Sequence, residues 1–185
     1  MKTLPEMGFE PLGFRFVKHF RIDTYEELNS EDARNIPLHD MFDLFVDPVV
    51  DHIHPEVRTV FGFVPIDEPL LDRVFVGHKY RLSEPFGTKG LLPLPDVLLA
   101  TKLRSVTQRD KVHKRIKDIA DIFALSWYSD EKLPGLREAL ARMIPSHETR
   151  TIVDSFTGED LSAVSSALGI ETHQIQRVLS ELRYP

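Results

Sequence analysis

The sequence contains no cysteine, and that absence excludes several kinds of chemistry at once. Without thiols the chain forms no disulfide, offers no thiolate to a metal ion and has no cysteine nucleophile. Long apolar runs are also missing, since no window approaches the roughly 18 apolar residues that a membrane-spanning helix needs. The stretch from Met1 to Glu6 has no apolar segment typical of a signal peptide. We therefore expect no membrane contact and, by default, a cytoplasmic location.

Familiar catalytic signatures are absent as well. No Ser/His/Asp arrangement, Walker-type phosphate loop or dinucleotide fingerprint can be recognised in the sequence. What is present is ordinary for a globular protein: 185 residues, of which 42% are hydrophobic and 28% are charged. This length predicts one domain, or one domain with a small appendage.

The net charge of −6 does not favour nucleic acid as a partner, because the field of the whole protein repels it. Basic residues nevertheless gather in one short segment: Lys102, Arg104, Arg109, Lys111, Lys114, Arg115 and Lys117. Two interpretations stay open for this segment. It is either the solvated face of a helix or a local patch that attracts phosphate.

The order of the predicted elements indicates an α+β protein. Alternating apolar and polar residues, broken by proline and glycine, predict strands over 13–22, 40–48, 58–64 and 73–82, with a short helix over 26–34. Helical periodicity then predicts helices over 95–108, 110–128, 134–145, 146–156, 159–168 and 171–182. We expect a sheet-rich part over 1–90, a helical part packing on that mixed sheet over 91–145, and C-terminal helices over 146–185.

One lysine falls inside an apolar helix stripe. Lys102 lies four residues after Leu98 and three after Leu99, on the face that the apolar residues of this helix share. A lysine in that position either extends its ammonium group to water or pairs with an enclosed acid.

The next predicted helix supplies two such acids. Its apolar residues lie on two sides, and Asp118 shares a face with Ile122, while Asp121 lies beside it. Enclosed acids need a cationic partner, and Lys102 belongs to the adjacent helix. We predict an ion pair between Asp118 and Lys102. The pair either only locks two helices together or also positions the lysine against a phosphate.

A second pair of acids lies in the predicted strand over 40–48. Asp43 and Asp47 are four residues apart and therefore lie on the same face of a strand. Carboxylates at a strand end commonly hold Mg²⁺ against a phosphate, so these two residues are candidate metal ligands. The alternative is a pair of exposed acids on an edge strand.

The last predicted helices resemble a helix-turn-helix. Gly169 falls at the turn, and the helix over 171–182 begins with a polar first turn. Its fixed cations are few, with Arg177 and Arg183 alone. The segment over 157–185 is therefore either a nucleic-acid contact or an ordinary pair of packed helices.

The central third of the chain resembles a known family. The helix start at Pro95-Asp96, Lys102 midway along that helix, Arg109, Lys117-Asp118 and then Asp121 follow one another as in AbiEii-type nucleotidyltransferases. That family belongs to the polymerase-β-like superfamily and includes toxins of abortive-infection systems. The resemblance extends over roughly residues 1–128 and implies a nucleotidyltransferase-like fold. The strand of Asp43 would correspond to the strand where the superfamily often carries its third metal-binding acid.

The resemblance also implies roles for single residues. Lys102, Asp118 and Asp121 would form the catalytic group, with Lys102 on the phosphates of a nucleoside triphosphate. Arg109 and Lys117 would bind the nucleotide, and Asp43 and Asp47 would hold Mg²⁺.

The superfamily's opening motifs are missing, however. No Gly-Ser or Gly-Gly pair and no Asp-x-Asp occurs anywhere in the sequence. Either a preceding segment or a partner chain supplies these elements, or catalysis has been lost. The leading hypothesis is transfer of a nucleotidyl group to an unknown acceptor. The alternative is an inactive scaffold, as a homo-oligomer or with a partner, that binds protein or nucleic acid, in one version as a toxin–antitoxin component.

Overall fold

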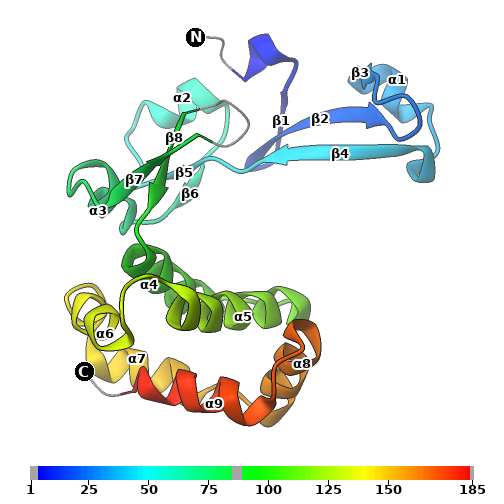
Figure 1. Ribbon diagram of the computed structural model, residues 1–185. Helices are drawn as coiled ribbons and strands as arrows, with labels where there is room; N and C mark the ends of the chain where they lie inside the picture. The colour runs from blue at the N-terminus through cyan, green and yellow to red at the C-terminus, as the bar shows by residue number, and fades with distance from the viewer. Residues whose placement is uncertain (1–3, 85–88, 184–185) are drawn as a thin grey trace. The chain divides into compact units, whose positions relative to one another are not determined.

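The computed structural model describes residues 4–84 and 89–183. The chain divides into two compact units, Met1–Pro69 and Leu70–Pro185. Strands dominate the first unit and helices the second, so the α+β prediction is confirmed (Figure 1).

The N-terminal unit is built around one antiparallel sheet. Its central strand β2 (Arg15–Arg21) buries the adjacent apolar residues Phe16 and Val17 near its start, and its other residues are partly buried. Strand β4 (Met41–Val46) pairs with β2 along its whole length, from Phe16 opposite Val46 to Arg21 opposite Met41. The short strands β1 (Glu10–Leu12) and β3 (Glu27–Leu28) pair with different halves of β2. Because β4 overlaps both, β1 and β3 share the other edge of β2.

The remaining elements of this unit are short. They are the 3₁₀ turns η1 (Pro5–Met7) and η2 (Leu38–Asp40), helices α1 (Ser30–Arg34) and α2 (Val57–Phe61), and the parallel strand pair β5 (Val49–Val50) and β6 (Ile66–Asp67). The apolar cluster under the sheet is small and rests on Phe9, Phe16 and Phe63. The Phe16 and Phe63 rings meet edge to face, with centroids 5.1 Å apart.

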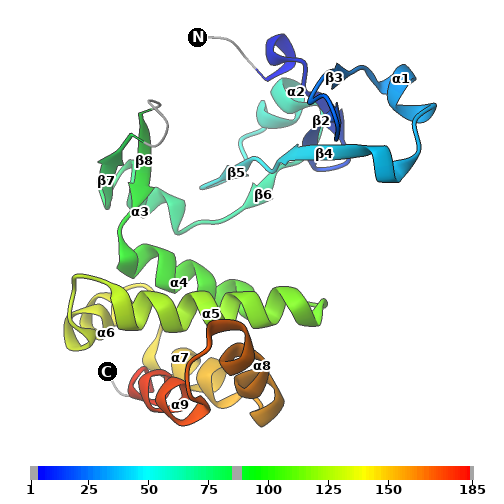
Figure 2. The same ribbon diagram turned by 45° about the vertical axis from the view of Figure 1, so that its right-hand side comes forward.

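The C-terminal unit carries the main hydrophobic core. Its elements are α3 (Leu71–Phe75), the hairpin β7 (Tyr80–Ser83) and β8 (Gly90–Pro93), and the helices α4 (Pro95–Val106), α5 (Val112–Tyr128), α6 (Leu133–Ala141), α7 (Ser146–Asp154), α8 (Gly158–Leu168) and α9 (Thr172–Glu181). Figure 2 shows α5 running across the unit, and it packs against α4, α6, α8 and α9. Phe123 and Leu103 are fully buried at the centre of this core.

Local chemistry explains how the helices of the second unit begin and end. Pro95 occupies the first turn of α4, where the missing N–H costs nothing, and Asp96 lies beside the positive end of the helix dipole. Thr157 and Asp160 form a reciprocal capping box at the start of α8. Gly169 adopts the left-handed conformation that ends α8, with φ of 66°, and α9 follows. The two helices predicted over 159–168 and 171–182, with Gly169 at the turn between them, are therefore confirmed.

Two predicted strands are wrong. Residues 57–61 form helix α2, which Gly62 ends with φ of 76°, although the β-branched Thr59 and Val60 favoured a strand. Residues 71–75 form helix α3, and only the second half of the predicted strand over 73–82 belongs to β7. Val74 is 2% exposed, and α3 packs against α4, so tertiary packing overrides the local preference.

Two further expectations need correction. The predicted helix over 26–34 is divided, since Glu27–Leu28 form β3 and only Ser30–Arg34 are helical, after the Asn29 cap. The expected single mixed sheet is also absent from the described residues. The strands there belong to three small sheets, and the one parallel pair is β5 with β6.

The division between the units differs from the one expected at residue 90. The hairpin β7–β8 leads directly into α4, and the Leu94 N–H donates to the Lys79 carbonyl. Leu70 already belongs to the core of the second unit. The helices of 91–145 and of 146–185 share that core and form one unit. Across the described ranges, no helix has both the length and the apolar character that crossing a membrane requires.

Candidate functional site

The structure brings Lys102 of α4 and Asp118 of α5 together, as the sequence predicted. The Lys102 Nζ lies 2.8 Å from the Asp118 Oδ1. The Asp118 side chain is 2% exposed, whereas the Lys102 side chain is 29% exposed. Burial of a carboxylate requires compensating hydrogen bonds, so Asp118 is the anchor of this group and Lys102 is its outward-facing partner.

Both oxygens of Asp118 accept hydrogen bonds. Besides the bond from Lys102, the Arg109 Nε donates to Oδ2 over 2.5 Å, and the Ser105 hydroxyl donates to the same oxygen over 3.1 Å. Arg109 is therefore a partner of Asp118 in this structure. Ser105, which the sequence analysis missed, could have been found from its position three residues after Lys102, on the same helix face.

Asp121 is a second acid on Lys102. Its Oδ2 lies 2.7 Å from the lysine Nζ, and its side chain is 37% exposed. A lysine ammonium group has three N–H donors, and Asp118 and Asp121 account for two of them. Within the described part of the chain, the third donor therefore remains for a ligand or for water.

The surroundings shift two pKa values in this group. Burial raises the pKa of Asp118, but hydrogen bonds and charge from Arg109 and Lys102 outweigh it and leave the pKa below its usual 3.8. For Lys102, burial lowers the pKa, while the hydrogen bonds and charges of Asp118 and Asp121 raise it above 10.5. Asp118 is therefore ionised and Lys102 protonated at neutral pH.

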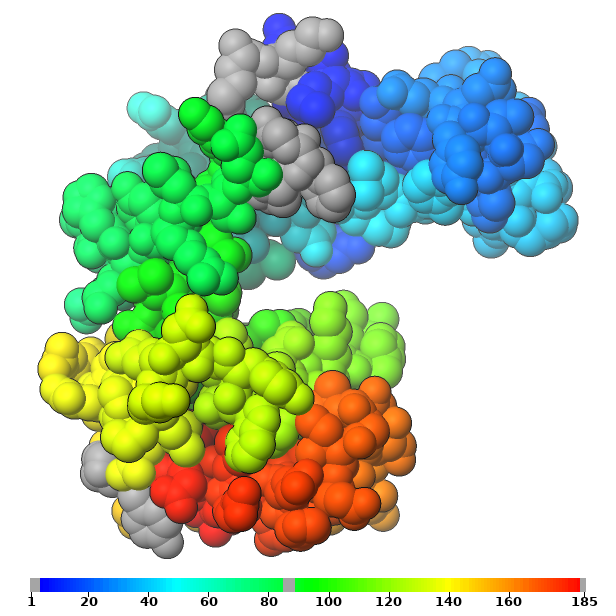
Figure 3. Space-filling view, in the orientation of Figure 1, coloured from blue at the N-terminus to red at the C-terminus, as the bar shows by residue number. Residues whose placement is uncertain are grey.

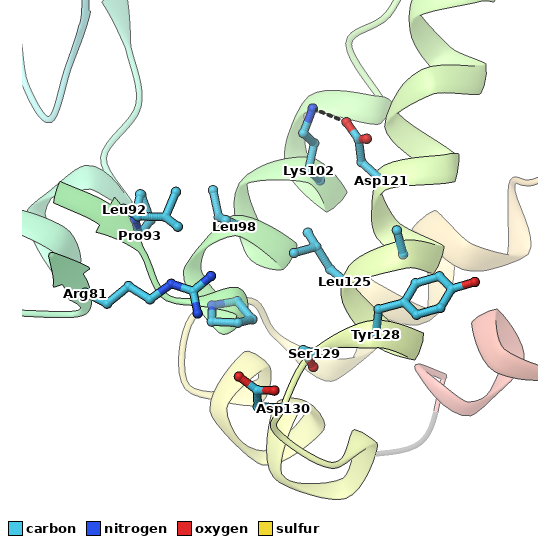
Figure 4. A pocket seen from close by; sticks show the side chains of 12 residues that line it. Arg81, Leu92, Pro93, Leu98, Lys102, Asp121, Leu125, Tyr128, Ser129 and Asp130 are labelled. Atoms are coloured by element: carbon cyan, nitrogen blue, oxygen red, sulfur yellow. Dashed lines mark ion pairs between the residues drawn. The ribbon is translucent and has the colours of Figure 1, made fainter. Parts of the chain in front are cut away.

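Lys102 and Asp121 border a pocket of about 440 Å³ within the second unit. Helices α4 and α5 and the hairpin β7–β8 supply its walls: Arg81, Leu92, Pro93, Pro95, Leu98, Lys102, Asp121, Ala124, Leu125, Tyr128, Ser129 and Asp130. In Figure 4 Leu98 and Leu125 lie between the Lys102–Asp121 pair at one end and Ser129 and Asp130 at the other. The pocket has the size and the mostly apolar lining of small-molecule sites.

Lys117 has no contact with this group among the described residues. It is exposed on α5, between the partly buried Ile116 and the buried Asp118. It shares the basic segment with Lys111 and Lys114, which are exposed too. The predicted role of Lys117 in nucleotide binding stays a prediction.

The other two predicted site residues belong to the N-terminal unit. Asp43 accepts a hydrogen bond from the His19 Nδ1 over 2.7 Å, directly across the β2–β4 ladder. Asp47, which follows the end of β4, lies 3.0 Å from the Arg15 Nε. Each carboxylate is thus already engaged by a basic side chain. Within the described ranges, no group of three or more His, Cys, Asp or Glu side chains is arranged to hold a metal.

These contacts lend no support to a Mg²⁺ ion held by Asp43 and Asp47 together. A metal there would compete with Arg15, which contacts both oxygens of Asp47, and with His19, which contacts one oxygen of Asp43. The magnesium site stays a prediction.

The chain matches no family model, no curated protein and no solved structure. Function is therefore inferred from the chemistry of the pocket and of the Lys102 group.

Proposed function

We propose that this protein binds a nucleoside triphosphate in the pocket beside Lys102, as a nucleotidyltransferase-like protein. One observation carries the proposal: a protonated lysine, fixed by two acids, lies at the end of a mostly apolar pocket. A fixed ammonium group needs little reorganisation to bind a phosphate oxygen. The order of Lys102, Arg109, Asp118 and Asp121 along the chain, which resembles AbiEii-type enzymes, supports the same assignment.

The charge balance of the pocket limits how phosphate binds. Lys102 and Arg109 carry two positive charges, and Asp118 and Asp121 carry two negative ones, so this group is neutral as a whole. The pocket wall adds one positive charge from Arg81 and one negative charge from Asp130, so the lining as a whole is balanced too. We infer that phosphate oxygens contact the free donor of Lys102 and the guanidinium of Arg81, while the apolar wall packs against the base or sugar.

Transfer itself needs more than binding. In a nucleotidyl transfer an acceptor oxygen bonds to the α-phosphorus, the bond from that phosphorus to its bridging oxygen breaks, and pyrophosphate leaves. The Gly-Ser turn and the Asp-x-Asp pair that the resemblance would call for are missing from the sequence. Binding is thus the property that the residues of this chain support, and transfer is proposed only where another segment or chain completes the site.

Calorimetry on the intact chain tests this proposal. We expect a nucleoside triphosphate to bind more tightly than the corresponding nucleoside by about tenfold or more, since one charge-assisted hydrogen bond contributes about 1.5–3 kcal/mol. Titrations with and without Mg²⁺ show whether the metal accompanies the nucleotide. Equal affinity for nucleoside and triphosphate would contradict a phosphate role for Lys102. Absence of any binding would favour the alternative of a scaffold that binds other macromolecules.

A further inference from the structure

Strand β4 (Met41–Val46) forms an open edge of the N-terminal sheet. One of its edges is paired with β2 along the full six-residue register. Its other edge has no strand partner among residues 4–84 and 89–183. In Figure 1, β4 lies beside β2 at the margin of the sheet, and in Figure 3 the light-blue to cyan atoms of residues 41–46 are exposed to view.

This edge has few of the features that normally protect an edge strand from pairing. Five of its six residues are apolar, the single charge is Asp43, and the strand contains no lysine and no proline. Phe42, Leu44 and Phe45 are 37%, 47% and 42% exposed. Apolar side chains thus project from both faces of a strand whose outer N–H and C=O groups are free to pair.

We propose that β4 pairs antiparallel with β4 of a second copy of this chain, which joins the two N-terminal sheets across a two-fold axis. An edge strand is complementary to itself in this arrangement, because antiparallel pairing about a two-fold axis presents identical edges to each other. Residues directly opposite each other project from the same face. Phe42, Leu44 and Val46 of both copies would therefore form one continuous apolar layer.

Charge selects the register of this pairing. A register with Asp43 opposite Asp43 is disfavoured, since like charges directly across a ladder repel. The next register that keeps the faces aligned places Leu44 opposite Leu44 and Asp43 opposite Phe45. The Arg15 guanidinium lies 4.7 Å from the centroid of the Phe45 ring. In this register each Asp43, which His19 holds within its own sheet, lies across from the Phe45 ring of the other copy and near the Arg15–Asp47 pair beside that ring. The register therefore avoids placing two Asp43 carboxylates directly opposite each other.

Cysteine cross-linking tests both the pairing and its register, because the natural chain has no cysteine. In the proposed register the two Leu44 Cβ atoms lie about 4.5–5.5 Å apart, close to disulfide geometry. We expect Leu44→Cys to form a covalent dimer under mild oxidation. Leu38→Cys is the matched control, since Leu38 is 85% exposed in the same unit but lies outside β4. Leu44→Cys should cross-link roughly ten to a hundred times faster, because pairing raises the local thiol concentration.

A mixture of Phe42→Cys and Val46→Cys chains tests the register independently. The mixture should cross-link, and each variant alone should not. Light scattering should show a dimer for the natural chain and a monomer for Leu44→Lys, with unchanged circular dichroism as the check on folding. A monomeric natural chain, or equal cross-linking of Leu44→Cys and Leu38→Cys, would overturn the proposal. So would a dimer in which the Phe42 and Val46 variants each cross-link alone. None of these outcomes depends on nucleotide binding.

Discussion

Lys102 and Asp118 join α4 to α5 through an ion pair in which one partner is buried and the other reaches the surface. The Nζ–Oδ1 distance is 2.8 Å, and the exposed fractions are 29% for the lysine and 2% for the acid. This asymmetry makes Asp118 a structural anchor and leaves Lys102 available to a ligand. The two residues should therefore respond differently to substitution.

Asp118→Asn should lower the free energy of unfolding by about 2–3 kcal/mol, because Lys102 and Arg109 would lose their buried partner. This loss in unfolding free energy is smaller than the loss expected for a fully buried ion pair, since both cations are partly exposed. Asp121→Asn is the matched control: the same chemical change at a residue 37% exposed should cost less than about 1 kcal/mol. Urea titration of the two variants measures the difference. Equal losses would show that Asp118 is not the anchor.

The pH dependence of stability should follow from the same carboxylate. The pKa of Asp118 is below 3.8 in the folded protein, so its contribution is present above that value and is lost as the pH falls through the lowered pKa. Asp160 has a lowered pKa too, and its contribution has the same sign. Unfolding free energies measured from neutral pH into acid should fall less steeply for Asp118→Asn than for the natural chain. Parallel curves would argue against this linkage.

Asp160 connects α8 to α5. Burial raises its pKa, but bonds from the Thr157 N–H and from Arg115 outweigh this and lower it. Asp160→Ala should remove both the cap and the Arg115 contacts, at 3.1 and 3.2 Å, and cost about 2 kcal/mol. The exposed neighbour Glu159→Ala should change stability by less than about 0.5 kcal/mol. Thermal unfolding of both variants distinguishes a specific cap from a general effect of charge.

The Lys102–Asp118 pair could be predicted because charges interrupt apolar stripes at helical spacing. Lys102 falls among the leucines of α4, and Asp118 lies on the face of α5 that Ile122 shares. The start of α4 is marked by Pro95 and Asp96, and α5 has clear helical periodicity, so the bounds of both helices were predicted to within a few residues. The second contact of the lysine, with Asp121, was not predicted, although Asp121 is one turn beyond Asp118.

Other parts of the molecule depend on contacts that a single sequence does not reveal. Helix α2 forms from residues with a strand preference, and its end is set by Gly62 in the left-handed conformation. The pocket is lined by Arg81 from β7 and by Tyr128 from the end of α5. These residues are far apart in the sequence and share no motif. Asp43 and Asp47 are four residues apart, which placed them on one strand face. The contacts of each carboxylate, however, are set by the cross-strand partners His19 and Arg15.

Lys102 is the residue proposed to bind phosphate in the pocket. The most direct measurement compares nucleoside triphosphate binding, by calorimetry, for the natural chain, Lys102→Met and Lys114→Met. Lys114 is exposed on the neighbouring helix and does not line the pocket, so its substitution removes the same charge from outside the site. We predict that Lys102→Met weakens binding by about 10- to 100-fold, while Lys114→Met changes it by less than about threefold. Equal weakening by the two variants, or no effect of Lys102→Met, would contradict the proposed phosphate-binding role of Lys102.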